Sequence, residues 1–457
     1  METMETTETS ISHSTRANAE DGKRLHHHVH SGEVADDGIF NFKVQTSQLD
    51  TNDKFKDDLL LFSFPIQYMR HMNQVLKGFN LKDDQQYFVD ECKEVIAVAE
   101  NHQNEKGGGK MSFQSFFYNI PESITAVNDR AIMVLAINPL SDPKESDTPV
   151  NYLLAGYIHA NLFDHEPGDS GKVETGFYYN VLRVSDKRVE GKRVYRRMSV
   201  FSLMFTILND LVNMHGVNFA YACMGKENLS IKRALHRNAL AHNRHYERVP
   251  FTVFSKVNLL YGSRKYSEQL VEITHNEQML RRMYAMVKER MGTYMFFHYI
   301  SEEGFIRFIK KLTEYSESSG VFMIPDRDGN IASAAIAMNW GEFFLFQIQN
   351  PKGIFKLVQK SRVMEHFLRF LMPVGEPAEY RKLMKGLSYK YRKEHGVGVT
   401  FLPTFKGDPY YGVSKSLLSD EYMNFIICND EERLKKLKER SACPDGNPRM
   451  FIDVPIT

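Results

Sequence analysis

The sequence has few cysteines and no long apolar run. It contains four cysteines, Cys92, Cys223, Cys428 and Cys443, which lie far apart and form no CxxC pair. This spacing favours a reducing compartment and free thiols over a disulfide framework. No apolar run approaches the roughly 20 residues that a membrane-spanning helix requires, and the polar N-terminus does not resemble a secretory leader. We therefore expect a cytoplasmic or nuclear protein that does not bind membranes.

The chain also lacks an excess of charge of either sign. Its 58 Lys and Arg residues nearly balance 57 Asp and Glu residues, for a formal net charge of +1. A near-neutral chain has no long-range attraction for polyanions, so direct nucleic-acid binding is not expected. With 42% hydrophobic residues, the 457-residue chain is long enough for two or three globular domains. Composition does not determine the oligomeric state.

Large apolar residues are nearly missing from residues 1–37, which are predicted to be a disordered tail. The tail contains a cluster of histidines at His26, His27, His28 and His30. No Cys or carboxylate stands at metal-ligand spacing beside them, so a solvated tail is the favoured interpretation over a metal site. We expect no metal.

Alternating apolar and polar residues predict strands before the middle of the chain. The strand segments are Ile39–Thr46, Arg130–Asn138, Asn151–Phe163 and Val173–Ser185. Helical spacing of apolar residues predicts two helices, Asp57–Leu76 and Asp83–Asn101. These segments predict an antiparallel meander that leads into the stretch after Val173.

The stretch from Val173 to Phe254 organises the chain. After the strand ending at Ser185 come a basic loop (Asp186–Arg193), an apolar helix (Val194–His215), a strand (Val217–Met224), a helix (Leu229–Leu240) preceded by Asn228, and a strand (Glu247–Lys256). The loop contains Arg188, Gly191, Lys192 and Arg193 and leads to a helix N-terminus. Backbone N–H groups, the positive helix end and cationic side chains together predict a phosphate site.

This order resembles the acetyl-CoA site of the GNAT superfamily of N-acetyltransferases. More narrowly, Asn218–Asn228 followed by Tyr246–Phe254 looks like the plant HOOKLESS-type acetyltransferases. The resemblance implies an α/β (α+β) fold with a GNAT-like, mixed, mostly antiparallel sheet flanked by helices, and acetyl-CoA as co-substrate. The cofactor-binding residues that it implies are the main chain of Leu182 and Val184 together with Arg188, Gly191, Lys192, Arg193 and Asn228.

Acetyl transfer to an amine needs a base, a polarised carbonyl and a proton for the departing thiolate. Glu174, on the strand before the loop, is a candidate base, although a carboxylate at a strand's start is also typical of a solvated surface. The family places a tyrosine acid about two turns after the asparagine; Leu235 stands there, so His236 or Tyr246 would have to substitute.

A second candidate row lies on the strand Asn151–Phe163. His159 alternates with Tyr157 and Asn161, so the three share one face. The row would line an acceptor groove, or His159 would be a satisfied structural histidine, which is the commoner outcome.

The chain after residue 266 shows a second α/β pattern. Its predicted elements are Glu268–Met291, Glu302–Ser316, Gly320–Pro325, Ile331–Trp340, Glu342–Gln349, Ala378–Glu394, Gly398–Phe405, Glu421–Cys428 and Glu431–Arg440. This order also resembles an acetyltransferase half and suggests a degenerate second copy. It has no second basic glycine loop, so only the first copy is expected to bind CoA. The predicted domains are therefore 1–37 (tail), 38–266 (GNAT) and 267–457 (C-terminal α/β).

The favoured function is an N-acetyltransferase that moves the acetyl group of acetyl-CoA to an amine of a small molecule or a protein. The alternative is a non-catalytic regulator or scaffold of the same fold, with or without CoA binding. Arg193, at a position where the family has a small residue, and the missing tyrosine favour this alternative. A nucleotide-binding protein is disfavoured because neither the Walker nor the Rossmann glycine pattern is present.

A substitution in the loop tests the predicted phosphate site. Gly191→Glu should abolish acetyl-CoA binding while sparing the fold, because it places bulk and negative charge against the phosphates. Calorimetric titration with acetyl-CoA, with CoA and ATP as comparison ligands, measures the loss. Unchanged acetyl-CoA affinity in a folded Gly191→Glu protein would refute the placement of the site in this loop.

Overall fold

The computed structural model describes most of the chain between residues 27 and 443. Described are 27–35, 39–49, 57–96, 100–103, 110–117 and 122–443, the last apart from positions 127, 129, 142, 144, 166–172, 186–187, 190–191, 194–199, 201–203, 205–216, 218, 226–231, 234, 238, 240–243, 350–355, 357–359 and 361–365. For β1, β2, β4, β5, β9 and β10, defined below, only the course of the backbone is described.

Strands dominate the described residues. They are β1 (His27–Ala35), β2 (Ile39–Leu49), β3 (Asp57–Pro65), β4 (Glu100–Gln103), β5 (Lys110–Phe117), β6 (Ala131–Pro139), β7 (Tyr152–His165), β8 (Glu174–Val184), β9 (Arg188–Val189), β10 (Lys192–Arg193), β11 (Phe219–Gly225), β12 (His245–Val257), β13 (Val271–Glu272), β14 (Gly320–Pro325), β15 (Ile331–Asn339), β16 (Phe344–Gln349), β17 (Phe367–Gly375), β18 (Val399–Thr404) and β19 (Leu418–Cys428).

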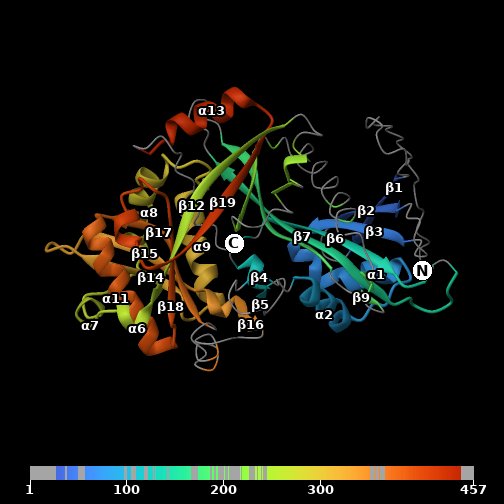
Figure 1. Cartoon of the computed structure of the whole chain (residues 1–457), viewed down its shortest axis with the longest axis horizontal. Coiled ribbons are helices and arrows are strands. Elements are labelled where there is room, and N and C mark those ends of the chain that lie inside the picture. Colours follow the sequence, from blue (N-terminus) through green and yellow to red (C-terminus); the bar gives the residue numbers. More distant parts are fainter. Residues whose placement is uncertain are drawn as a thin grey trace.

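Helices lie between these strands and flank them (Figure 1). They are η1 (Ile66–His71), α1 (Met72–Gly78), α2 (Gln85–Ile96), α3 (Glu122–Thr125), α6 (Asn258–Tyr261), α7 (Arg264–Ser267), α8 (Glu277–Met291), α9 (Glu302–Tyr315), η2 (Trp340–Glu342), α11 (Pro377–His395), α12 (Tyr411–Ser414) and α13 (Glu431–Arg440). Among the described residues, no helix is long and apolar enough to cross a membrane.

Fourteen strands form one sheet in the order β1-β2-β3-β6-β7-β8-β11-β19-β12-β18-β17-β15-β14-β13. Most neighbours are antiparallel, but β8 pairs with β11 and β17 pairs with β18 in parallel. The predicted fold class, a mixed and mostly antiparallel sheet flanked by helices, is confirmed. A smaller sheet, β16-β5-β4, joins Phe344–Gln349 to Lys110–Phe117 across a sequence separation of more than 200 residues.

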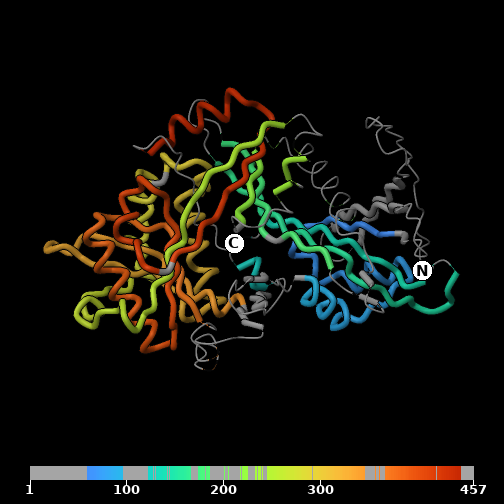
Figure 2. The backbone as a smooth tube through the Cα atoms, viewed as in Figure 1, coloured from blue at the N-terminus to red at the C-terminus, as the bar shows by residue number. Residues whose placement is uncertain are grey.

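In the middle of the large sheet, strands from the two halves of the chain alternate. β19 lies between β11 and β12, and β12 also pairs with β18. Figure 2 shows β12 and β19 as two long strands that run side by side between two lobes. The first, N-terminal lobe contains β3, β6 and β7 with α1 and α2, and the second, C-terminal lobe contains β14, β15, β17 and β18 with α8, α9 and α11. The strands of the predicted domains 38–266 and 267–457 are therefore paired in one sheet. The domain boundary itself stays a prediction.

Helix ends follow local capping chemistry. The side chains of Asn276, Ser301 and Asp430 accept hydrogen bonds from backbone N–H groups three residues later, at the starts of α8, α9 and α13. α11 begins with Pro377 and ends at His395, followed by the capping residue Gly396, whose φ is 68°. The cap at Asn276 explains why α8 begins at Glu277, not at the predicted Glu268.

Two predictions about the first part of the chain are wrong. Asp57–Leu76 is not one helix: Asp57–Pro65 is β3, and helical structure begins only after Pro65. The apolar run of β3 buries both of its faces, with Leu59 and Leu61 in one core and Phe62 and Phe64 in another. A strand buried on both sides loses the alternation by which strands are recognised.

The tail prediction also needs correction at its end. Residues 27–35, expected to be disordered, form β1, which pairs with β2 from His27 opposite Ser47 to Ala35 opposite Ile39. Backbone pairing satisfies hydrogen bonds whatever the side chains are, so polar composition alone did not exclude a strand. The metal interpretation of the histidine cluster concerns side chains outside the described part of the chain.

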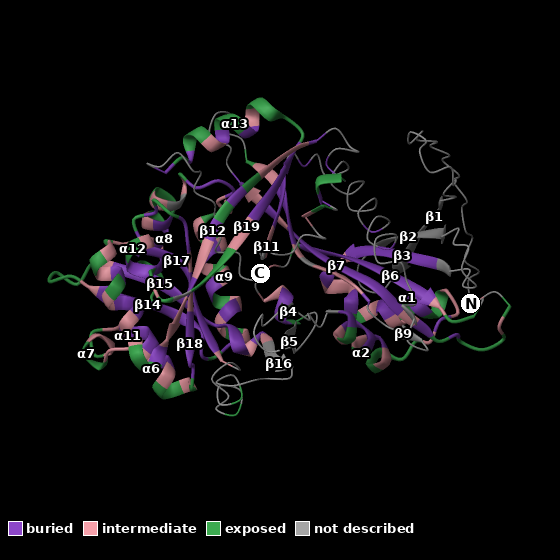
Figure 3. Cartoon of the chain, in the orientation of Figure 1, coloured by how far each residue is buried: buried purple, intermediate pink, exposed green. Residues whose placement is uncertain are grey.

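Burial is concentrated in the strands and the helix faces that cover them (Figure 3). One core joins side chains from both lobes, such as Phe62 and Leu135 of the N-terminal lobe and Ile336 and Leu371 of the C-terminal lobe. A second core lies on the opposite side of β7, β8 and β11, around Phe177 and Tyr179.

Two glycines with positive φ, Gly375 at the end of β17 and Gly396 after α11, differ in the space around them. Gly375 has a φ of +101°, and an added Cβ would meet the Cα of Ser333 at 2.7 Å and the carbonyl of Ala332. Gly396 also has positive φ, but nothing lies within 4 Å of its Cβ position. Gly396→Ala should therefore cost only the left-handed backbone strain of about 1–2 kcal/mol. Gly375→Ala should add about 1–3 kcal/mol of overpacking.

Chemical denaturation of the two variants beside the unsubstituted protein measures both free energies of unfolding. Equal losses in the two alanine variants would contradict the close approach of Ala332 and Ser333 to Gly375.

Candidate functional site

The parallel pair β8 and β11 is short and ends abruptly. Its register runs only from Gly176 opposite Phe219 to Tyr179 opposite Ala222, although β8 continues to Val184. A β-bulge lies at this point: Asn180 and Val181 together oppose the single residue His159 of β7. Bulges bend a strand and end its pairing on one side. Residues 180–184 of β8, which have no pairing with β11 among the described residues, are called the open edge below.

One hydrogen bond shows in which direction the backbone N–H and C=O groups of the open edge point. Ser185 donates its N–H to the carbonyl of Ala155 on β7 at 2.8 Å. Backbone groups alternate in direction along a strand, so those of Val184 and Leu182 point away from β7, toward the side of β11. The carbonyl of Leu182 accepts a hydrogen bond from Nη1 of Arg183 at 2.8 Å. Both residues thus present main-chain groups at the open edge, and their contact with a CoA arm stays a prediction.

One side of the sheet, here called the helical face, carries Phe177 and Tyr179 and is covered by helical residues Val200 and Met204. Gly156 of β7 allows this approach, because an added Cβ would lie 2.6 Å from Cε of Met204. Val200 and Met204 are the described part of the predicted helix Val194–His215.

The basic loop contains a short hairpin. Arg188 pairs with Arg193 and Val189 with Lys192, so the expected irregular loop includes β9 and β10 before the helix. The side chains of Arg188, Lys192 and Arg193, and residues Gly191 and Asn228 as a whole, lie outside the described part of the structure. The phosphate site stays a prediction.

The structure brings together the two residues suggested as a general acid. The rings of His236 and Tyr246 lie 5.1 Å apart, and Tyr246 stacks on Phe425 at 5.8 Å. Tyr246 packs against the core of the helical face. Burial raises the pKa of Tyr246 to about 12, with Arg248 opposing the shift, so its hydroxyl keeps its proton at neutral pH.

Glu174 lies apart from this pair. It forms an ion pair with Arg433 of α13, and its side chain is only 18% exposed. Six residues of strand separate Glu174 from the bulge at Asn180, which corresponds to roughly 20 Å. Its role as base stays a prediction.

The opposite side of the sheet, the polar face, carries buried polar groups in an apolar setting. Register places Asn161 opposite Tyr178, and Asn424 of β19 opposite Cys223 of β11; directly opposite residues share a face. The exposed fractions are 0% for His159 and 1% for Asn161, Tyr178 and Asn424. Alternation from Tyr178 assigns Asn180 to the same face.

These five residues, His159, Asn161, Tyr178, Asn180 and Asn424, are called the polar cluster. Among the described residues, their buried side-chain nitrogen and oxygen atoms have no hydrogen-bond partner of standard geometry. Burial lowers the pKa of His159, and the neighbouring Asn161 side chain opposes this shift. Each buried polar group without a partner costs about 1–3 kcal/mol. Such a group suggests a ligand or water contact, and five around one bulge make this face the stronger candidate for an acceptor site.

Burial controls protonation on this face. It lowers the pKa of His159 to about 3, that of His165 to about 4 and that of His298 to about 3. All three are therefore neutral at pH 7. Burial also raises the pKa of Cys223 to about 12, against the opposing effect of Arg369, so this thiol remains protonated.

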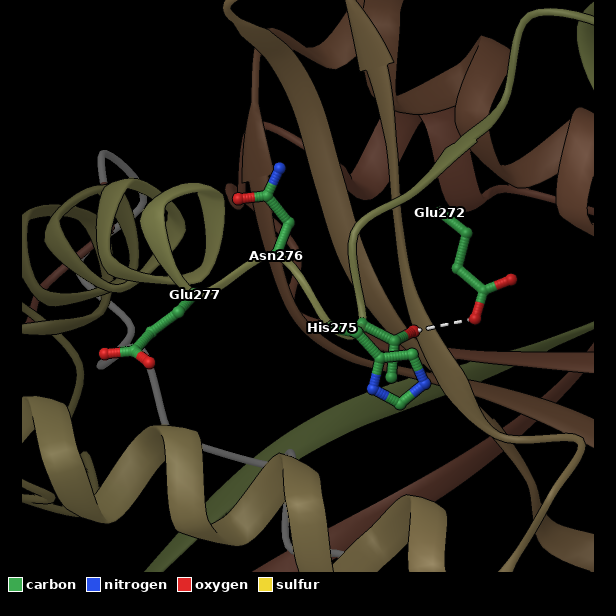
Figure 4. A pocket seen from close by; sticks show the side chains of 5 residues that line it. Glu272, His275, Asn276 and Glu277 are labelled. Carbon is green, nitrogen blue, oxygen red and sulfur yellow. Dashed lines mark hydrogen bonds between the residues drawn. The ribbon is translucent and has the colours of Figure 1, made fainter.

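A separate depression of about 580 Å³ lies at the far edge of the sheet (Figure 4). It is lined by Glu272, Thr274, His275, Asn276 and Glu277. Glu272 accepts a hydrogen bond from Thr274 at 2.9 Å, and Asn276 caps α8. These polar groups serve local structure. Within the described ranges, no group of three or more His, Cys, Asp or Glu residues is arranged to hold a metal.

Comparison with known proteins gives no family at the level of sequence. No family model matches the chain, and no curated protein matches it. The expected resemblance to HOOKLESS-type enzymes is not shown.

Three of the solved structures with a similar arrangement come from an N-acyltransferase or a probable one. Two structures of Saccharomyces cerevisiae N-myristoyltransferase with bound myristoyl-CoA have a TM-score of 0.47. The first is 10% identical, and the match covers 75% of this chain and 79% of the yeast chain. The second is 9% identical, and the match covers 84% of this chain and 81% of the yeast chain. A protein of unknown function from Enterococcus faecalis, a probable N-acyltransferase, has a TM-score of 0.40 and 9% identity, covering 84% and 75%. Likenesses this weak do not decide the activity of this chain.

The buried histidines predict how stability depends on pH. An unfolded histidine takes up a proton below about pH 6.5, whereas His159 in the folded protein does so only near pH 3. Unfolding therefore binds protons between these values, and stability is full above pH 6.5 and falls as the pH drops toward 3. Each such histidine contributes up to about 1.4 kcal/mol per pH unit.

His159→Leu should reduce this slope by about one proton, as measured by denaturant unfolding at several pH values from 7 to 4. Tyr178→Phe, a change in the same cluster without a titrating group in this range, is the control. An unchanged slope in His159→Leu would show that His159 is not held neutral.

Proposed function

We propose that the chain is an acyl-CoA-dependent N-acyltransferase that uses acetyl-CoA and transfers the acetyl group directly to an amine. One observation carries the proposal: the parallel pairing of β8 with β11 ends at a bulge, where main-chain groups face the open edge. On one side of this edge lies the helical face, next to the predicted phosphate loop. On the other side lies the polar cluster.

This arrangement separates the two substrates. A thioester whose amide-containing arm hydrogen-bonds to the backbone of Leu182 and Val184 would extend beside β8 as an added strand does. Its phosphates would remain on the side of the basic loop. An acceptor amine would approach from the polar face, next to Asn180. Enzymes gain much of their rate from holding two reactants in such an orientation.

In the proposed reaction, the amine nitrogen attacks the thioester carbonyl carbon. The new C–N bond forms, the C–S bond breaks, and the thiolate leaves and takes up one proton, while the nitrogen releases its proton to solvent water. Cys223 does not fit an acyl-enzyme route, because burial raises its pKa to about 12 and keeps it a neutral thiol. Direct attack is therefore the favoured route.

The described residues support distinct roles around this reaction. Neutral His159 can accept a hydrogen bond from the acceptor amine, although a pKa of about 3 makes it too weak a base to keep a proton at pH 7. Tyr246 keeps its hydroxyl proton and lies on the helical face, two strands from β11. It is the proposed donor to the thiolate.

A second candidate function is a non-catalytic protein of the same fold. The hydrogen bond from Arg183 to the Leu182 carbonyl favours it, because this acceptor is already occupied by the protein itself. Titration with acetyl-CoA and detection of the free thiol released in the presence of a panel of amines separate the two. Saturable binding without thiol release would support the regulator or scaffold.

A backbone substitution tests the open edge directly. Val184→Pro removes an N–H that faces away from β7, at the last residue of β8, so it should leave the β7 pairing intact. Losing one backbone hydrogen bond of about 1 kcal/mol should weaken acetyl-CoA binding roughly fivefold, with little change in thermal stability. Val184→Ala retains the N–H and serves as the control. Equal affinity in the proline and alanine variants would exclude Val184 as a donor to the CoA arm.

A further inference from the structure

The turn that follows β12 exposes apolar side chains. Leu259 and Leu260 of α6 are 69% and 85% exposed, and Leu417, directly before β19, is fully exposed. Ser416 donates a hydrogen bond to the carbonyl of Ser255 at 3.1 Å, which holds the residues before β19 beside the end of β12. Six large hydrophobic side chains are exposed among the described residues, and three of them lie here. Exposed apolar side chains that gather in one place indicate a binding surface.

Cations surround these leucines. Nζ of Lys256, near the end of β12, lies 4.9 Å from the ring centre of Tyr261, and Nζ of Lys385 on α11 lies 5.9 Å from the same ring centre. Lys256 also donates a hydrogen bond to the carbonyl of Lys415. Arg381 is four residues before Lys385 on α11, so the two side chains are neighbours on the helix surface. The four cations and the three exposed leucines are called the basic apolar patch.

No carboxylate neutralises the basic apolar patch. Among the described residues, none of its four cations forms an ion pair with an Asp or Glu side chain, whereas two other lysines of α11 pair with acids of the same helix. Burial, together with the positive charges of Arg381 and Lys385, lowers the pKa of Lys256. Like charges that lie close together repel each other, so an approaching anion stabilises them.

The basic apolar patch lies at one end of the molecule. α6, α7 and α11 lie together in the C-terminal lobe, at the end that points away from the N-terminal lobe (Figure 1). Their backbones are in close contact: an added Cβ at Gly262 would lie 2.8 Å from the backbone nitrogen of Tyr389, and Ser263 donates its N–H to the carbonyl of Lys385 at 2.9 Å. This packing fixes the leucines of α6 beside the cations of α11.

We propose that the basic apolar patch binds the surface of a membrane that contains anionic phospholipids. Leu259, Leu260 and Leu417 insert between the lipid headgroups and the upper acyl chains, while the four cations contact lipid phosphate and carboxylate groups. Tyr261 has the apolar body and polar tip typical of membrane–water interfaces. The proposal does not depend on acyl transfer. It replaces the expectation that the protein does not bind membranes, which rested on the lack of a long apolar run, because surface binding requires none.

The composition of the basic apolar patch favours a membrane over a protein partner. Lysine is depleted at protein–protein interfaces, but three of the four cations here are lysines: Lys256, Lys385 and Lys415. Lysine suits a lipid surface, because its apolar stem can lie along the acyl chains while the ammonium group remains among the headgroups. Leucines and lysines in one patch therefore match the two layers of a lipid surface.

Sedimentation with lipid vesicles tests the proposal. The full-length protein should bind vesicles of phosphatidylcholine mixed with an equal amount of phosphatidylserine at least tenfold more tightly than vesicles of phosphatidylcholine alone. Binding should weaken as the salt concentration rises, since salt screens the attraction between the cations and the headgroups. No binding to the mixed vesicles, or equal affinity for the two kinds of vesicle, would overturn the proposal.

Substitution of the leucines tests the apolar insertion. The double change Leu259→Ser and Leu260→Ser should weaken binding to the mixed vesicles at least tenfold, because the buried apolar area is lost. Both side chains are exposed, so the fold should be retained. Leu140→Ser changes a leucine that is 57% exposed but lies at the end of β6, and it is the matched control that should leave binding unchanged. Full affinity in the double variant would overturn the insertion of α6.

Substitution of the cations tests the electrostatic attraction in the same assay. Lys385→Gln should weaken binding to the mixed vesicles about fivefold, the contribution of one cation near an anionic surface. Arg381→Gln, at an exposed position, is the second variant if Lys385→Gln does not fold. Lys310→Gln, at a lysine of α9 whose side chain is 76% exposed, is the control. Unchanged affinity in the folded patch variants would overturn the role of the cations.

An acidic polypeptide distinguishes a protein partner from a lipid surface. Poly-glutamate offers carboxylates without acyl chains, so it should bind at least tenfold more weakly than the mixed vesicles. Tight binding of poly-glutamate that the double leucine change leaves intact, together with weak binding to the vesicles, would overturn the lipid surface in favour of an acidic protein.

Discussion

The candidate site depends on a pairing that stops early. β8 and β11 share a parallel register only as far as Tyr179 and Ala222, because the bulge at Asn180 bends β8 away. A regular pairing would have used the backbone groups of Leu182 and Val184 within the sheet. The bulge instead leaves them at an edge, next to a face of buried polar side chains. The bulge that interrupts the pairing thus leaves directional backbone groups at the edge where the proposed acyl-CoA arm would bind.

This local defect is held in place by long-range pairing. β19 lies beside β11, and β12 lies beside β18, so each lobe contributes a strand to the other. The exchange explains why Asn424, more than 180 residues after β11, lies on the same face as Tyr178. The polar cluster combines residues of β7 and β8 with Asn424 of β19, so its arrangement requires both halves of the chain to fold into one sheet.

Local patterns in the sequence were sufficient for most strands and for the order around β8 and β11, since alternation and glycine positions are local. The row formed by His159 and Asn161 was also visible. Both faces of β3 are buried, which hid its alternation. The insertion of β19 is a pairing between distant segments, and no local pattern encodes it. The signal for Asn424 was a polar residue within an apolar strand, but without the pairing it could not be joined to β8.

The second parallel pair, β17 and β18, is also short, and a side chain of the protein lies where its pairing ends. β17 and β18 also separate after three residues, and a register shift follows near Met372, whose φ is 48°. There Arg290 donates to the carbonyl of Pro373 and packs 3.7 Å over the ring of Tyr410, and it lies 3.8 Å from Asp408. Its guanidinium thus occupies a backbone acceptor near the shift. A degenerate second copy stays a prediction. At this second strand separation a side chain of the protein occupies the backbone acceptor, whereas the buried side-chain nitrogen and oxygen atoms of the polar cluster have no hydrogen-bond partner among the described residues.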